Sequence, residues 1–131
     1  MSFYTGIKQI MSSDASLNEY TSNSIYAMSS LEEIKESERS IIVYGYNKDG
    51  IEGSLDNPEE LSIWSIYIYI GSPRAATVFS ISTRLNEYLN RYKDSNFRNI
   101  RFISGGREPE FDSENNVYYT DLEFSAIYQG D

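Results

Sequence analysis

The sequence predicts an α+β domain in which a small, mostly antiparallel sheet has a long helix packed across it, with a short helix at the N-terminus. Three observations predict this class: a strand pattern at Ile63–Ile70, a Ser-Pro step followed by a broad apolar stripe, and alternating apolar residues near the C-terminus. The 131 residues have the size of one domain, and no Pro/Gly/Ser linker divides them. We therefore expect a single domain over residues 1–131.

The composition favours a soluble protein that binds other proteins. Hydrophobic residues make up 40% of the chain, enough for a core, and the 12 tyrosines suit strands and protein interfaces. The formal charge of -9 disfavours general binding to nucleic acid or to an anionic membrane. The chain has no cysteine, and Met1–Met11 lacks the apolar stretch of a signal peptide or a membrane span. We therefore expect synthesis inside the cell and no membrane partner.

The N-terminal third alternates between apolar and polar segments. Apolar residues in Phe3–Met11 follow the i, i+4, i+7, i+8 spacing of a short amphipathic helix. Asp14–Ser24 is expected to be too polar for burial, and Ile25–Met28 to be a short strand or turn. Leu31–Arg39 carries many charges in succession and is expected to be a loop or one helical turn.

Two strands are expected next. Ile41–Tyr46 is rich in β-branched residues and tyrosine, and Asn47–Gly50 supplies turn residues at the start of a polar excursion over residues 47–60. In Ile63–Ile70, the tryptophan and three isoleucines at even positions share one face, while Tyr67 and Tyr69 lie on the other. Because both faces are partly apolar, we expect both to contact protein.

The long helix is expected to follow directly. Ser72 is the predicted N-cap and Pro73 lies in the first turn. The apolar stripe that should face the sheet consists of Ala76, Val78, Phe79, Ile81, Leu85, Tyr88, Leu89 and Tyr92. The opposite side is expected to carry Arg74, Arg84, Glu87 and Arg91.

The C-terminal third is expected to be β-structure. A short strand over Asn99–Ile103 ends at Gly105-Gly106. Glu108–Phe111 and Val117–Tyr128 read as the arms of a hairpin joined by Asp112–Asn116. The last arm alternates apolar and polar residues, which predicts one core face and one largely wet face.

The residue types exclude the commonest catalytic sites. Without histidine or cysteine, the chain has no Ser-His-Asp or Cys-His arrangement and no site for zinc on these ligands, so we expect no enzyme and no cofactor. Carboxylates remain, and Glu108, Glu110 and Asp112 alternate so that they could hold Mg²⁺. The favoured interpretation is a solvated hairpin edge whose charges oppose aggregation.

Three further motifs have a structural and a functional interpretation. Asp112–Asn116 is rich in oxygen ligands but lacks the glycine and distal glutamate of an EF-hand, so a turn is favoured. Gly105-Gly106 followed by Arg107 could hold a phosphate, yet no P-loop or GxGxxG surrounds it. A basic group interleaved with aromatic residues is either a local nucleic-acid surface, a helix face paired with Glu87 and Asp94, or a protein interface; its members are Arg84, Arg91, Lys93, Arg98 and Arg101, with Tyr88, Tyr92 and Phe97.

The order of these segments resembles that of the small tail terminator, or tail completion, proteins of long-tailed bacteriophages. The segments that carry the resemblance are "SIYAM", "SIIVYGY", "SIWSIYIYIGSPRAATVFSISTRLNEYL" and "YYTDLEFSAIY". The matching elements are the strand Ile41–Tyr44, the strand and helix over Ile63–Tyr92, and the last strand Tyr118–Tyr128. The resemblance as a whole runs from Asp14 to Tyr128. The family usually has a proline before its first strand, where this chain has Glu38-Arg39-Ser40.

The resemblance implies a structural protein of the virion. A tail terminator forms a hexameric ring that caps the finished tail tube, stops its polymerisation and presents a surface to the head. The implied partners are further copies of the chain, the tail tube protein and a head-completion or connector protein. The implied location is the head-proximal end of the tail, after assembly in the host cytoplasm, and acidic character would suit a channel through which DNA slides without specific binding.

The hypothesis assigns two surfaces. Subunit contacts are expected at Tyr67, Tyr69, Glu108 and Phe111. Tube or connector contacts are expected in the loop Asn47–Glu60, at Asn47, Lys48, Asp49, Glu52, Glu59 and Glu60. Two alternatives stay open: a head-completion, or stopper, protein at the connector, and an acidic inhibitor that mimics DNA, which would need its acids on one face.

Overall fold

The computed structural model describes residues 3–27, 40–52 and 61–129, and the predictions for Met28, for Leu31–Arg39, and for Glu59 and Glu60 lie outside these ranges. The elements in chain order are α1 Phe3–Ser12, α2 Ala15–Thr21, β1 Ile25–Ala27, β2 Ile41–Glu52, β3 Leu61–Ser72, α3 Ala75–Leu89, β4 Phe97–Gly105, β5 Glu110–Asp112 and β6 Val117–Gln129. This mixture of helices and one sheet confirms the α+β class. In the part of the chain so described, no helix has the length and apolar content needed to span a bilayer.

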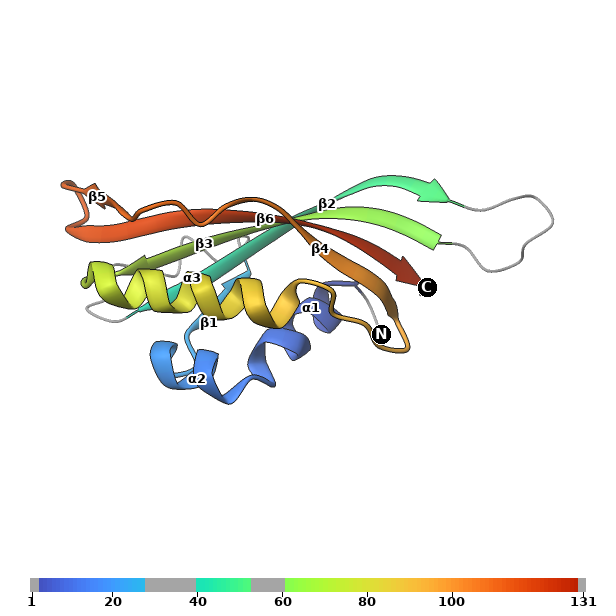
Figure 1. The fold of residues 1–131 in the computed structure, drawn as a ribbon, viewed down its shortest axis with the longest axis horizontal. Coiled ribbons are helices and arrows are strands. Elements are labelled where there is room, and N and C mark those ends of the chain that lie inside the picture. The colour runs from blue at the N-terminus through green and yellow to red at the C-terminus, as the bar shows by residue number, and fades with distance from the viewer. Residues whose placement is uncertain (1–2, 28–39, 53–60, 130–131) are drawn as a thin grey trace.

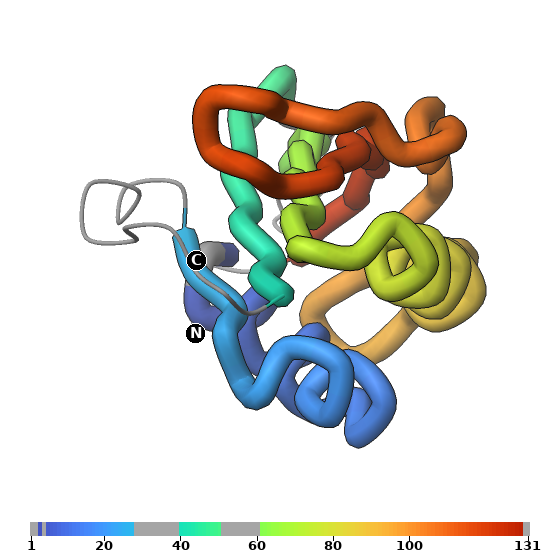
Figure 2. The backbone as a smooth tube through the Cα atoms, turned by 90° about the vertical axis from the view of Figure 1, so that its left-hand side faces the viewer, coloured from blue at the N-terminus to red at the C-terminus, as the bar shows by residue number. Residues whose placement is uncertain are grey.

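The sheet and the helices form two layers. The strands lie in the order β1-β2-β3-β6-β4, and β5 pairs with the remaining length of β6. β1 runs parallel to β2, and the other pairings are antiparallel. The helices α1, α2 and α3 lie on one side of the sheet, while β2 and β3 extend beyond them at one end (Figure 1). In Figure 2, a view turned by 90°, α3 lies apart from α1 and α2, which lie together beneath the strands.

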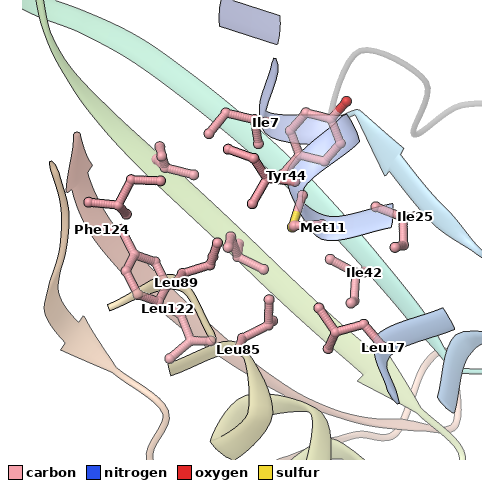
Figure 3. Packing of buried hydrophobic residues seen from close by; sticks show 14 of the residues in the cluster. Ile7, Met11, Leu17, Ile25, Ile42, Tyr44, Leu85, Leu89, Leu122 and Phe124 are labelled. Atoms are coloured by element: carbon pink, nitrogen blue, oxygen red, sulfur yellow. The ribbon is translucent and has the colours of Figure 1, made fainter. Parts of the chain in front are cut away.

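Apolar residues from every layer meet between the sheet and the helices. In β3, the even-numbered Ile66, Ile68 and Ile70 are buried as their alternation predicts. Leu85 and Leu89 of α3 lie near Leu122 and Phe124 of β6, and residues of α1 and α2 pack against β2 (Figure 3). One connected core therefore joins all three helices to the sheet.

The strand β2 is longer than predicted. Asn47–Gly50, expected as a turn, belongs to a strand that continues to Glu52 and pairs with β3 down to Leu61. The register with β3 shifts at a bulge between Lys48 and Gly50, which leaves Asp49 as the extra residue. The carboxylate of Asp49 accepts a hydrogen bond from the Ser65 hydroxyl. Pairing along β3 thus outweighs the local preference of these residues for a turn.

The segment Asp14–Ser24, expected to be too polar for burial, contains a helix with one buried side. Asp14, Leu17, Thr21 and Ser24 are all buried. Asp14 is the N-cap of α2, since its carboxylate accepts from the Leu17 amide at 3.1 Å, and the Thr21 hydroxyl donates to the Leu17 carbonyl. Local hydrogen bonds therefore satisfy polar groups that would otherwise oppose burial.

The helix α3 begins later and ends earlier than predicted. Ser72 belongs to β3, where its hydroxyl bonds that of Ser40, although it also accepts from the Arg74 amide; Arg74 itself occupies the N-cap position. At the other end, Tyr92 lies beyond the helix. Within it, Ala76 and Phe79 are exposed rather than core-facing, because the buried residues follow a narrower stripe through Val78, Ile81, Ser82, Leu85 and Leu89.

The predicted C-terminal hairpin is present, but its first arm is β5, Glu110–Asp112, rather than the predicted Glu108–Phe111. The turn after Asp112 joins β5 to β6. β4 extends over Phe97–Gly105, longer than the predicted Asn99–Ile103. β4 and β5 pair with consecutive stretches of β6, so they form one edge that is interrupted after Gly105. The Gly106 amide still donates to the Asp121 carbonyl at 2.8 Å, which holds the start of the interruption against β6.

Candidate subunit interface

The sheet face opposite the helices, called the outer face below, carries the first candidate residues. By strand alternation it contains Tyr67 and Tyr69 of β3 and Tyr119, Asp121 and Glu123 of β6. Tyr67 is 38% exposed, whereas Tyr69 is half-buried and stacks on Tyr119 with ring centroids 5.9 Å apart. Large aromatic side chains with accessible edges are the type of residue that protein interfaces favour.

Two adjacent depressions lie on this side of the sheet. Tyr67, Tyr69 and Glu123 line the first, and Arg107, Glu108 and Glu110 line the second. Ser104, Gly105 and Asp121 belong to both. The structure therefore brings three of the four predicted interface residues, Tyr67, Tyr69 and Glu108, to one continuous surface.

Phe111, the fourth predicted interface residue, faces the other way. It pairs with Tyr118, and the two rings lie 4.9 Å apart. Tyr118 packs against the core on the helix side of the sheet, so Phe111 lies on that side as well. It is 50% exposed there. Phe111 thus belongs to a different surface from Tyr67 and Tyr69, because a single step along a strand reverses the face.

Several acidic side chains lie close together on the outer face. The carboxyl pKa of Asp121 is raised by desolvation and, less strongly, by the charge of Glu110. The Tyr119 hydroxyl donates to Glu110 at 2.9 Å, and this bond raises the tyrosine pKa. Burial raises the pKa of Tyr69, and the charges of Asp112 and Asp121 add to the effect. These groups hold negative potential over a surface that also offers aromatic contact area.

Four of the predicted tube-contact residues lie in β2 rather than in a free loop: Asn47, Lys48, Asp49 and Glu52. Asn47, Lys48 and Asp49 are exposed, as that role would require. The Lys48 ammonium lies 6.0 Å from the centre of the Trp64 ring, within reach of a cation–π interaction. Glu52 ends the strand, and its side chain, like Glu59 and Glu60, lies outside the described part.

Hydrogen bonds explain the acidic motif of the hairpin. Asp112 accepts from the amides of Glu114 and Asn115 and from the Asn115 side chain, which lowers its pKa. It therefore acts as a turn-forming residue. Within residues 3–27, 40–52 and 61–129, no three acidic side chains gather closely enough to hold a metal ion, which argues against the Mg²⁺ and Ca²⁺ readings there.

The diglycine has a backbone explanation. Gly105 and Gly106 have φ of 104° and 69°, values that favour glycine. A side chain on Gly105 would collide with the Asp121 carbonyl oxygen. Both glycines therefore serve the interruption of the sheet edge.

The basic group is divided by the fold. Arg84 pairs with the buried Asp14, a contact that was not predicted, and approaches Glu87 at 3.9 Å as expected. Asp94 instead accepts bonds from the Tyr92 hydroxyl and from the amides of Asn96 and Phe97. The remaining basic residues, Arg91, Lys93, Arg98 and Arg101, are exposed near the start of β4.

Sequence reasoning missed the contribution of Ser104, Tyr119, Asp121 and Glu123 to the depressions. Their alternation in β6 indicates a wet face, but only the pairing of β6 with β3 places Glu123 opposite Tyr67 and Asp121 opposite Tyr69. The alternation within each strand therefore indicates which residues face outward. It does not indicate which residues of β3 and β6 become neighbours, because that depends on the register between the strands.

Comparison with known proteins gives a likeness of fold. No protein-family model and no curated protein matches the sequence. A chain of a solved structure described as "Virion of native gene transfer agent (GTA) particle" superposes with a TM-score of 0.66 at 14% identity, covering 95% of this chain and 92% of that chain. At this identity the likeness shows that the two chains share a fold across nearly their whole lengths.

Proposed function

We propose that the protein is a structural component of a phage-like virion. The observation that carries this proposal is the fold shared with a chain of a gene transfer agent virion over 95% of the present sequence. The outer face supports it, because exposed tyrosines beside shallow depressions suit contacts between protein subunits. The proposed role is structural and requires no catalytic group.

The proposed station is the head-proximal end of a tail. There the protein would cap the finished tube as a hexameric ring, stop tube polymerisation and bind the head-completion or connector protein. This finer assignment rests on the order of sequence segments that resembles tail terminator proteins. The outer face would then contact neighbouring copies, and the exposed stretch Asn47–Asp49 would contact the tube or the connector.

Deletion of the gene in the element that encodes it tests this role. We expect tails of abnormal length that fail to join heads, together with full heads that lack tails, as seen by electron microscopy of the lysate. Restoring the gene from a plasmid should restore both features. Tails of normal length that still fail to join heads would instead assign the protein to the head-completion station, and normal particles would refute a virion role.

A further inference from the structure

The acidic residues of the C-terminal hairpin gather at one end of the sheet, called the acidic end below. Its members are Glu108, Glu110, Asp112, Glu114 and Asp121. The basic residue Arg107 lines the second depression together with Glu108, Glu110 and Asp121. Because Asp121 is desolvated and repelled by Glu110, this surface would be stabilised by an incoming cationic group.

The basic residues gather elsewhere, at what is called the basic edge below: Arg91, Lys93, Arg98 and Arg101. Arg98 donates to the Gln129 side chain at 2.8 Å. Arg91, Lys93 and Arg101 are exposed, and no ion pair joins them to an acid within the described ranges. Their charges are therefore available to a partner.

The two groups are separated along the sheet. Arg101 pairs with Ser125, and Glu110 pairs with Tyr119, so the two positions are six residue steps apart along β6. At about 3.3 Å per residue this separation is about 20 Å. Figure 1 shows β5 at one end of the sheet, while β4 starts beside the C-terminal end of α3, toward the other end. Glu110 and Arg101 of one chain therefore cannot pair with each other directly.

This separation favours contact between copies. A surface that repeats on each chain and meets a different surface on the next chain forms a heterologous interface, which generates a ring when the rotation closes. Opposite potentials select this arrangement over contact between two identical ends, since like charges repel. Tyr67, Tyr69 and Tyr119 add apolar contact area beside the acids.

We propose that the acidic end of one copy, with the neighbouring tyrosines of the outer face, binds the basic edge of the next copy. The proposal rests on the proposed ring function for its biological meaning, and it specifies the surfaces by which such a ring closes. The occupant of the depressions is then a second copy of this chain, with Arg101 and Lys93 contributing cations to the acids around Asp121.

Charge reversal tests the contact in solution. One variant carries Glu108→Lys and Glu110→Lys, and the other carries Lys93→Glu and Arg101→Glu. Light scattering coupled to size exclusion should show each variant alone associating about tenfold more weakly than the natural chain, or not at all. An equimolar mixture should regain the natural mass, because each reversed surface meets its complement. The control reverses Lys8 and Glu19, exposed on α1 and α2, and should keep the natural mass.

A cross-linking experiment gives an independent readout, since the chain has no cysteine of its own. The variant with both Glu108→Cys and Lys93→Cys should give a ladder of disulfide-linked species on mild oxidation. Each single variant should stop at low yields of dimer. Folding of every variant is checked by circular dichroism before oxidation. The proposal would be overturned if the natural chain stays monomeric at its highest soluble concentration and the double-cysteine variant gives no ladder. Failure of the mixed charge-reversed variants to restore association would also overturn it.

The charge-reversal experiment and the gene deletion can fail independently of each other. If the charge reversals abolish association while deletion leaves particles normal, the contact stands and the tail role fails. If deletion gives abnormal tails while the reversed variants still associate and restore normal particles, the role stands and this contact fails. A natural chain whose acidic end captures a basic peptide yet never a second copy would also overturn the proposal.

Discussion

Asp14 accepts hydrogen bonds from two separate parts of the chain. Its carboxylate caps α2 through the Leu17 amide and pairs with the guanidinium of Arg84 on α3, at 3.0 Å from Nε. The Asp14 side chain is 7% exposed. Sequence reasoning did not find this contact because the partner lies 70 residues away. Local pattern indicates a polar segment, and only the packing of α2 against α3 shows why the polarity is tolerated.

Replacing Asp14 tests both roles. Asp14→Ala should lower the free energy of unfolding by about 1 kcal/mol for the lost cap alone, and further because Arg84 loses its partner. Asp14→Asn keeps an oxygen that can accept from Leu17, so it should be less damaging. Urea denaturation followed by circular dichroism measures both variants. Glu19→Gln, on the exposed side of α2, serves as the control and should change stability little; an equal loss in the control would contradict the assignment.

The same residue predicts a pH dependence. The hydrogen bond from Arg84 holds the pKa of Asp14 below its ordinary value, so the folded chain binds fewer protons there than the unfolded chain. The stabilisation is therefore complete above the unfolded value of about 3.9 and is lost as the pH falls through the folded pKa. The stability difference between the natural chain and Asp14→Asn should be constant near neutral pH and shrink in acid. A difference that grows on acidification would contradict this sign.

At the scale of elements, periodicity predicts well where burial decides the structure. The even positions of β3 and the alternation in β6 were assigned correctly because one face of each strand is in the core. The course of β2 beyond Tyr46 was wrong because Asn47–Gly50 has the composition of a turn. There the hydrogen bonds supplied by β3 decide the conformation, and those bonds depend on a strand ten or more residues away.

The helix α1 is held by aromatic contacts near the extended end of the sheet. The ring of Phe3 stacks on Trp64 with centroids 4.2 Å apart and also contacts Tyr46, Phe97 and Tyr128. Because Phe3 is 4% exposed, its removal leaves a cavity between α1 and the strands. This cluster connects the N-terminal helix to strands from the middle and the end of the chain.

Phe3→Ala should therefore lower the free energy of unfolding by about 3 kcal/mol and accelerate hydrogen exchange of the α1 amides. Phe79→Ala is the matched control, since this phenylalanine is 60% exposed on α3; its effect should stay within about 0.5 kcal/mol. Denaturant titration and exchange measured by mass spectrometry provide the two readouts. Equal losses for the two variants would show that the cluster does not anchor α1.

At the scale of the whole molecule, the candidate surface was only partly predictable. Tyr67 and Tyr69 were found from alternation within one strand, whereas Asp121 and Glu123 join them through strand register. The separation of the acidic end from the basic edge depends on β4 running antiparallel to β6. Segments that look equally charged in the linear sequence are thereby placed at different positions on the sheet, and no local pattern contains that information.

The connected core also predicts how the chain unfolds. Buried residues of all three helices and of β1, β2, β3, β4 and β6 belong to one cluster, so no subset of elements has a core of its own. Trp64, the one tryptophan of the chain, packs against this cluster on β3, and its fluorescence reports on the end of the sheet that holds α1. Circular dichroism reports on the helices and strands as a whole.

We expect the two signals to follow a single transition in urea, with the same midpoint, because loss of any layer exposes the core of the others. The experiment is run at two protein concentrations, since a midpoint that rises with concentration would reveal stabilisation by self-association. In the variant that carries Glu108→Lys and Glu110→Lys, the concentration dependence should disappear while the two probes still coincide. If fluorescence changes well before circular dichroism, the extended end of the sheet unfolds separately and the description of one cooperative domain fails.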